Sequence, residues 1–229
     1  PTGERYALDA DGLRLLAPVI PSKVYGLAKN YEAHAQFMHE SGHSEIAHAP
    51  EDMVIFSKPS TSVIGPDDPI VIPSYSNDMN FEPEVAVIMG RIAKNVPVEK
   101  AMDYVLGFTC VNDVTLRDLQ GLDPMWTRAK GFDTSCPLGP WIQTELDWKD
   151  AKISFTLNGE DVPMASGTTA NLIHGIPEQI AAISSFSTLL PGDVIMTGTP
   201  NASGHLDPGD EPIVHVAGIG SLRNVVVRG

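Results

Sequence analysis

The sequence predicts a β-rich α+β fold with short helices outside its sheets. Between residues 53 and 75, short apolar segments alternate with Pro, Gly, Asp and Ser, a pattern typical of strands joined by turns. The pair Asn158-Gly159 lies between two further strand-like segments and favours a β-hairpin. One clear amphipathic helix is predicted, over residues 177–189. Strands therefore dominate the expected fold.

The first 50 residues are expected to combine extended segments with one helix. Residues 1–21 are expected to form an N-terminal extended segment and residues 22–229 the main domain. A helical pattern covers residues 31–40. The stretch that follows, SGHSEIAHAPED, is polar and rich in His and Gly, so it has little to bury in a core. Residues 31–50 are therefore expected to act as a mobile lid.

Further elements are predicted in the middle of the chain. A short helix is expected from Pro97, with Val98, Met102 and Val105 on its inner side. The strand GFTCVND follows and ends at Asp113. Asp113 is placed to cap a helix formed by DVTLRDLQ.

The last third of the chain is expected to add a helix and two strand segments. The helix over residues 177–189 has Ile180, Ile183 and Leu190 or a neighbour facing inward. Strand patterns follow in DVIMTGTP and IVHVAGIGSLRNVVV. The sequence contains no internal repeat.

The segment NFEPEVAVIMG, residues 80–90, places two carboxylates at the start of an apolar strand. Because side chains alternate along a strand, Glu82 and Glu84 share one face with Ala86 and Ile88. The residues after them are apolar on both faces, which predicts an inner strand with both carboxylates near the rim of a core. Two like charges in that position share a proton or bind a cation. The alternative is a solvated pair at a strand start.

Composition restricts the partners and the type of site. The chain has 229 residues, 42% of them hydrophobic, and a net charge of -14, so one large domain is expected and nucleic acid is not an expected partner. No apolar run approaches the roughly 20 residues that span a bilayer, and no signal segment is recognisable, so a soluble cytoplasmic protein is expected. Cys110 and Cys136 lack CxxC spacing, which argues against a disulfide scaffold and a thiolate zinc site. Cys110 is predicted to be a core residue.

Five segments occur in an order that resembles the fumarylacetoacetate hydrolase family. They are FEPEVAVIMG, DYVLGFTCVNDVTLRDLQ, MWTRAKGFDTSCPLGPW, LLPGDVIMTGTP and GIGSLRNVVV. The resemblance covers roughly residues 22–229. It implies a catalytic domain with the β-roll of that family's C-terminal domain, and a homodimer.

The resemblance also implies that Glu82, Glu84 and Asp113 hold one Mg2+ or Mn2+ ion. Three carboxylates on rigid strand ends leave about three places in an octahedral shell, which suits a bidentate 2-oxo acid and one water. Lys130 resembles the family's active-site lysine, which stabilises a developing enolate. From the residues alone, Asp113 could instead be a helix cap and Lys130 a surface lysine.

Two further residues are candidates for contact with the substrate. Gln120 resembles a family residue that contacts the substrate oxygen or orients water. Thr199 follows a predicted strand and precedes Pro200, so its hydroxyl and nearby amides are placed to hold a substrate carboxylate. The alternatives are a glutamine on a helix surface and an ordinary turn threonine.

His34 resembles the family's catalytic histidine, and its titration near neutrality suits proton transfer. Many members carry a glutamate three residues later, but Phe37 occupies that position here, which weakens the case for hydrolysis. Glu40 or Glu45 could take over that role after the lid closes. Three other histidines in this stretch fit no standard zinc site and are better explained by a solvated loop: His39, His43 and His48.

The function implied by the resemblance is divalent-metal-dependent cleavage of the C3-C4 bond of a 2-oxo acid through an enolate held by the metal. Decarboxylation of oxaloacetate to pyruvate and carbon dioxide is the leading hypothesis, because it needs no water nucleophile. Hydrolysis of an acylpyruvate such as fumarylpyruvate, isomerisation of an unsaturated 2-oxo diacid, and a non-enzymatic binding module stabilised by a cation remain alternatives. The sequence does not fix the C4 substituent of the substrate.

Overall fold

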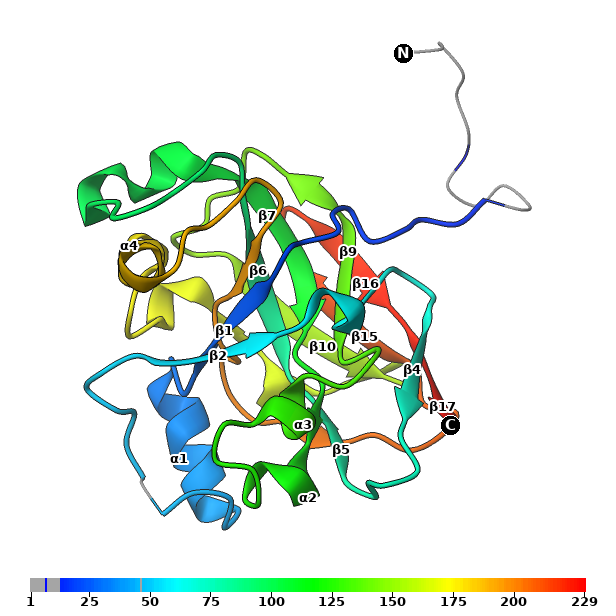
Figure 1. The fold of residues 1–229 in the computed structure, drawn as a ribbon. Coiled ribbons are helices and arrows are strands. Elements are labelled where there is room, and N and C mark those ends of the chain that lie inside the picture. Colours follow the sequence, from blue (N-terminus) through cyan, green and yellow to red (C-terminus); the bar gives the residue numbers. More distant parts are fainter. Residues whose placement is uncertain (1–6, 8–12, 46) are drawn as a thin grey trace.

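The computed structural model describes residue 7, residues 13–45 and residues 47–229, and these residues confirm the β-rich α+β prediction (Figure 1). The expected N-terminal segment 1–21 lies largely outside them, and its residues 13–21 form neither helix nor strand. The α-helices are α1 (Glu32–Glu40), α2 (Arg117–Gln120), α3 (Thr127–Lys130) and α4 (Ile176–Phe186). The 3-10 helices are η1 (Ser60–Ser62), η2 (Val98–Tyr104), η3 (Pro163–Ala165) and η4 (Thr169–Asn171). No helix in the described ranges is long and apolar enough to cross a bilayer.

A seven-stranded sheet with the order β2-β1-β13-β6-β7-β9-β3 lies at the centre of the domain. Its strands are β1 (Val24–Ala28), β2 (Val54–Lys58), β3 (Val63–Ile64), β6 (Pro83–Met89), β7 (Val105–Asn112), β9 (Cys136–Gln143) and β13 (Val194–Met196). Strands β6 and β7 are antiparallel neighbours near its middle. Strands β1 and β13 are parallel, so their carboxyl ends lie at the same edge of the sheet.

Three smaller sheets complete the roll. The largest has the order β11-β10-β15-β16, with β12 also paired to β10. Its strands are β10 (Lys152–Leu157), β11 (Glu160–Asp161), β12 (Gly167–Thr168), β15 (Pro212–Val216) and β16 (Gly220–Arg223). The others join β14 (Gly204–His205), β5 (Met79–Phe81) and β8 (Thr115–Leu116), and β17 (Val225–Arg228) with β4 (Pro69–Ile72).

The predicted hairpin is confirmed at Asn158 and Gly159, which join β10 to β11. Both residues have positive φ, 55° and 81°, as a two-residue hairpin turn of this type requires. Glycine reaches this region without strain, and asparagine tolerates it better than most residues.

Strand β6 contributes to two separate cores, one on each face of the central sheet. Val85, Val87 and Met89 belong to the larger core, which also contains side chains of β10 and β15. Ala86 and Ile88 belong to the second core, together with side chains of β1, β2, β7, β9 and β13. The expected inner strand is confirmed, because every residue of β6 is buried. The face that carries Ala86 and Ile88 is the face that continues from Glu82 and Glu84.

Two of the expected helices are confirmed as α-helices. Helix α1 begins one residue after the expected start, and α4 buries Ile180 and Ile183 completely. Leu190 is 39% exposed, because α4 ends at Phe186 and the buried neighbour is Leu189.

The expected inner face of the helix after Pro97 is wrong at Val98, which is 46% exposed. This segment forms the 3-10 helix η2, which has three residues per turn, so spacing chosen for an α-helix does not mark one of its faces. Ala101 is the residue that η2 buries.

Asp113 does not cap a helix. Residues Thr115–Leu116 are extended as β8 and pair with β5, so helix α2 begins only at Arg117. Cys110 is buried in the core, as predicted, and Cys136 is buried as well; both are free cysteines.

The contact between β7 and β9 should tolerate no side chain at Gly107. A Cβ there would lie 2.5 Å from the backbone oxygen of Gln143, which the sheet holds in place. We expect Gly107→Ala to lower the free energy of unfolding by about 1–3 kcal/mol, measured by urea denaturation. Gly121→Ala is the matched control, since no atom lies within 4 Å of its Cβ position, and it should change stability by no more than about 0.5 kcal/mol. Equal effects of the two substitutions would contradict this packing.

Candidate active site

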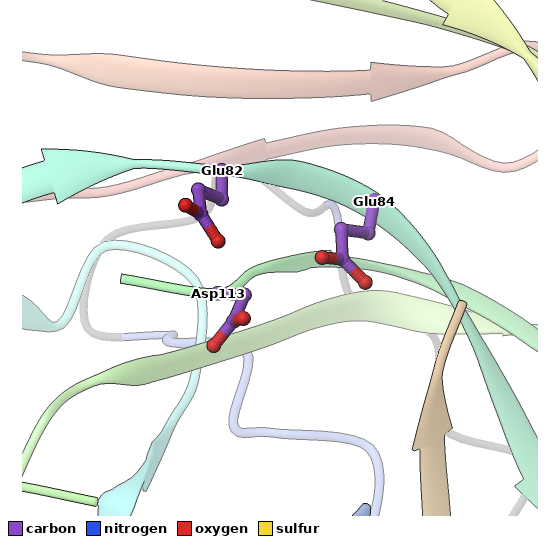
Figure 2. A group of neighbouring side chains, drawn as sticks. All are labelled: Glu82, Glu84 and Asp113. Carbon is purple, nitrogen blue, oxygen red and sulfur yellow. The ribbon is translucent and has the colours of Figure 1, made fainter. Parts of the chain in front are cut away.

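Three carboxylates converge where β6 and β7 lie side by side (Figure 2). Glu84 lies in β6, Glu82 immediately precedes that strand, and Asp113 immediately follows β7. The register of the two strands is fixed at this end by a hydrogen bond from the backbone N–H of Asp113 to the carbonyl of Glu82. One carboxylate oxygen from each residue lies within 4.8 Å of the other two, and all three side chains are buried. We call these residues the carboxylate triad.

Three buried cations compensate the triad. Nζ of Lys130 lies 2.6 Å from Oε2 of Glu82 and 2.5 Å from Oδ2 of Asp113. Arg117 donates from Nη2 to Oε1 of Glu82 at 2.6 Å. Nζ of Lys58 lies 2.8 Å from Oδ1 of Asp113 but directs its hydrogen bonds to the carbonyls of Val114 and Ser135.

The carboxylates of Glu82 and Glu84 have opposite electrostatic environments. Burial alone would raise the pKa of Glu82, but the nearby Lys130 and Arg117 outweigh it and hold that pKa below its usual value. Burial and the charge of Asp113 raise the pKa of Glu84 well above its usual value. Glu84 is instead held by neutral donors, the backbone N–H of Gly198 at 2.7 Å and the hydroxyl of Thr199 at 3.1 Å.

The triad fits a hard divalent cation such as Mg2+ or Mn2+. All its donors are carboxylate oxygens, the ligand type that these ions prefer. Oδ1 of Asp113 is buried and accepts no hydrogen bond from the described residues, and its contact with them is the ion pair with Lys58. Glu84 forms no ion pair with them, so a cation would supply the positive charge that this carboxylate lacks.

His34 lies on α1 and is buried beside the triad. Its Nδ1 lies 2.5 Å from the carbonyl oxygen of Asn201, and a carbonyl only accepts, so Nδ1 carries the proton. Burial lowers the pKa of His34, although the charge of Glu82 opposes this. The imidazole is therefore neutral at pH 7, and its Nε2 has a lone pair available for a proton. The ring of Phe37 stacks on it at 6.4 Å between centroids.

A cavity of about 380 Å³ joins these groups. It is lined by seven of the residues expected from the sequence: His34, Glu82, Glu84, Asp113, Gln120, Lys130 and Thr199. Helix α1 and the α2–α3 segment lie at the same end of the domain and both contribute to the lining (Figure 1). Oε1 of Gln120 accepts a hydrogen bond from Arg117 at 2.6 Å, which leaves the amide of Gln120 to donate elsewhere.

The two lid glutamates lie outside the cavity lining. Glu40 is exposed and accepts a hydrogen bond from Gln36 at 2.8 Å, and Glu45 is exposed on the loop that follows. Among His39, in the last turn of α1, and His43 and His48, on the loop after it, His43 contributes to the lining. The others are engaged within the lid, His39 with the carbonyl of Ser44 and His48 with the carboxylate of Glu32. Within the described ranges, the triad is the cluster that could hold a metal ion.

Two further site residues, Arg117 and Lys58, are not among those expected from the sequence. Arg117 lies within the segment DVTLRDLQ, between Asp113 and Gln120, and a basic residue between two candidate site residues is a signal that could have identified it. Lys58 ends the apolar strand β2, and a charged residue at the end of an apolar strand is also a signal. Both are at most 5% exposed.

Comparison with known proteins gives consistent matches over nearly the whole chain. The family described as "Fumarylacetoacetate (FAA) hydrolase C-terminal" matches residues 23–227. The mitochondrial oxaloacetate tautomerase FAHD2A of Homo sapiens is 37% identical over 93% of this chain and 69% of its own length. A crystal structure of 5-carboxymethyl-2-hydroxymuconate delta-isomerase from Mycobacterium smegmatis is 46% identical, with a TM-score of 0.85 over 94% of this chain and 82% of that chain. The fumarylpyruvate hydrolase of Pseudomonas aeruginosa, in complex with Mn2+ and pyruvate, is 29% identical, with a TM-score of 0.83 over 96% of this chain and 94% of that chain.

Neutralising one member of the triad should weaken metal binding. We expect Glu84→Gln to reduce affinity for Mn2+ by about tenfold or more, because one of three charged ligands becomes a neutral amide. Titration followed by electron paramagnetic resonance of free Mn2+ measures this. Asp118→Asn is the matched control, since Asp118 lines the same cavity but is hydrogen-bonded to Ser76 and Asn77. Similar losses in the two variants would show that the cavity's general charge, and not the triad, attracts the ion.

Proposed function

This chain belongs to the fumarylacetoacetate hydrolase family, and on that premise we propose that it catalyses metal-dependent enolisation of a 2-oxo diacid. Oxaloacetate is the leading substrate and keto-enol tautomerisation the leading reaction. The observation that carries the proposal is the neutral His34, whose Nε2 is available in the same cavity as the carboxylate triad. The human relative named as an oxaloacetate tautomerase supports the choice of substrate.

The chain's own groups divide the work between binding and charge stabilisation. A divalent cation at Glu82, Glu84 and Asp113 would supply Lewis acidity, which makes the C3 protons of a 2-oxo acid more acidic. The ammonium of Lys130, fixed between Glu82 and Asp113, adds positive charge beside the oxygen on which negative charge develops. The free amide of Gln120 donates to a substrate oxygen, with its orientation fixed by Arg117.

His34 performs the proton transfer. Its Nε2 removes a proton from C3, the electron pair of that bond forms the C2-C3 double bond, and the former carbonyl pair moves onto the C2 oxygen. The imidazolium then returns the proton to that oxygen, which completes tautomerisation without a net gain or loss of protons. The carbonyl of Asn201 holds Nδ1–H throughout, so the ring keeps the tautomer that a base needs.

Hydrolysis is less well supported by this cavity. It needs a water activated toward the C4 carbonyl, and the residue three positions after His34 is Phe37, whose ring stacks on the imidazole. Glu40 points to a partner on its own helix, and neither it nor Glu45 belongs to the lining. The isomerase relative from Mycobacterium smegmatis, at 46% identity, is consistent with proton-transfer chemistry.

Decarboxylation of oxaloacetate remains the second candidate. It forms the enolate of pyruvate when the C3-C4 bond breaks and C4 leaves as carbon dioxide, whereas tautomerisation forms the enolate of oxaloacetate, and it also needs no activated water. Glu40 and Glu45, the two glutamates that could help His34 to activate water, do not line the cavity. This favours both reactions equally over hydrolysis. The two differ in their need for a base, because carbon dioxide can leave without one.

Substitution of His34 should separate these reactions. We expect His34→Gln to slow Mg2+-dependent tautomerisation of oxaloacetate, followed by the ultraviolet absorbance of its enol, by about 100-fold to 10,000-fold. Carbon dioxide release is measured in parallel, after subtraction of the spontaneous rate. His215→Gln, on the distant strand β15, is the control and should leave both rates unchanged. Fast carbon dioxide release that survives in His34→Gln would favour the lyase, and a wild-type protein that accelerates neither reaction would exclude the proposal.

The pH profile should report the neutral form of His34. Burial lowers the pKa of this imidazole from its usual 6.5, so the base form is present above the lowered value and is lost as the pH falls through it. We therefore expect kcat/KM for tautomerisation to be level near neutrality and to decline only below pH 6.5. Stopped-flow measurements in buffers of constant ionic strength test this. An acidic limb with a midpoint above the usual value would mean that another group supplies the base.

A further inference from the structure

We propose that Lys29 is a specificity residue that binds the second carboxylate of a 2-oxo diacid. The inference rests on the proposed function, because it assumes that the first carboxylate and the 2-oxo group lie at the triad. It goes further, because it identifies Lys29 as the residue that selects a diacid over a monoacid of equal length.

Lys29 lies in the turn between β1 and α1, and its side chain lines the cavity that contains His34 and Thr199. The residue after it, Asn30, fixes this turn firmly. Nδ2 of Asn30 donates to the carbonyl of Thr197 at 2.9 Å and to that of His174 at 3.1 Å. Because β1 and β13 are parallel, this places Lys29 on the same edge of the sheet as the segment that holds Glu84.

Lys29 differs from the other cations in the cavity lining. Lys130 and Arg117 are both engaged by triad carboxylates. Nζ of Lys29 donates to the hydroxyl of Ser44 at 2.5 Å and forms no ion pair with any residue that the structure describes. Burial lowers the pKa of Lys29, which agrees with an ammonium that is partly removed from water without a charged partner.

A substrate carboxylate is the partner that this ammonium lacks. A charge-assisted hydrogen bond to a carboxylate is roughly twice as strong as a bond between neutral groups, so it would supplement or replace the contact with Ser44. Asp118 of α2 lines another part of the cavity, and its negative charge would repel a second carboxylate. A 2-oxo diacid is therefore directed with its far end toward Lys29. A monoacid would leave the ammonium as it is.

The same contact would link substrate choice to the lid. Ser44 belongs to the loop after α1, so Lys29 already joins the wall of the cavity to the expected lid 31–50. A diacid bound at Lys29 would lie directly beneath this loop. Its second carboxylate would then contact the ammonium of Lys29, which joins the cavity wall to the loop through Ser44.

The test is equilibrium binding of two probes that carry no hydrogen on C3 and so cannot tautomerise; carbon dioxide release from the diacid is followed in parallel, because decarboxylation needs no C3 hydrogen. The probes are 3,3-difluorooxaloacetate, a diacid, and 3,3-difluoro-2-oxobutyrate, a monoacid with the same number of carbons. Their dissociation constants are measured by calorimetry in the presence of Mg2+. We expect Lys29→Met to weaken the diacid by about 10-fold to 100-fold and to leave the monoacid unchanged, because one charge-assisted bond is lost.

Two matched variants and a structural check complete the experiment. Lys29→Arg keeps the charge and should retain the preference for the diacid, while Lys100→Met removes an exposed lysine of η2 and should change neither constant. Thermal unfolding confirms that each variant folds; methionine meets the same positive φ of 53° that lysine already adopts. Equal weakening of both probes, or no weakening of the diacid, would overturn the inference. Selective weakening in a protein that fails to tautomerise oxaloacetate would uphold Lys29 and reject the proposed reaction.

Discussion

The burial of three carboxylates within a few ångströms of one another is the constraint on which the rest of this structure depends. Like charges in a low-dielectric interior are stable only when cations or donors compensate them. The chain supplies Lys58, Lys130 and Arg117, and each comes from a different element. This explains the short helices: α2 begins with Arg117, and α3 ends with Lys130. They position charges more than they cover the sheet.

The burial of β6 on both faces fixes the position of the carboxylates. Val85, Val87 and Met89 anchor the strand in the larger core, so the opposite face cannot rotate toward solvent. Glu82 and Glu84 are consequently held close to Asp113 despite the repulsion between their negative charges. A group that adds positive charge to the triad relieves the repulsion and gains affinity from it. The rigid sheet thus holds together a group of negative charges that would favour a cation, which supports the proposed metal site.

The sequence predicts the features that depend on local pattern. The alternation of β6, the turn at Asn158 and the inward side of α4 follow from spacing and turn chemistry, and the structure agrees. Predictions fail where a distant segment decides the conformation. DVTLRDLQ contains a helix pattern, yet β5 captures Thr115 and Leu116 as a strand, so Asp113 does not cap a helix. The pairing of Arg117 with Glu82 joins residues on different elements, and no local pattern indicates it. Ordered family motifs, by contrast, indicated the members of the triad together.

The hydrogen bond from His34 to Asn201, and that from Asn30 to Thr197, join two segments that lie 167 positions apart in the sequence. Strand β1 likewise takes β13 as its parallel neighbour. During synthesis the amino-terminal segment emerges long before its partners exist. A nascent chain can form the β6-β7 pair early. Strand β1 and helix α1, which carries His34, have no β13 to pack against until that strand has left the ribosome. The proposed base would therefore join the carboxylate triad only after β13 has been synthesised, and a chain that ends before β13 would carry the triad without it.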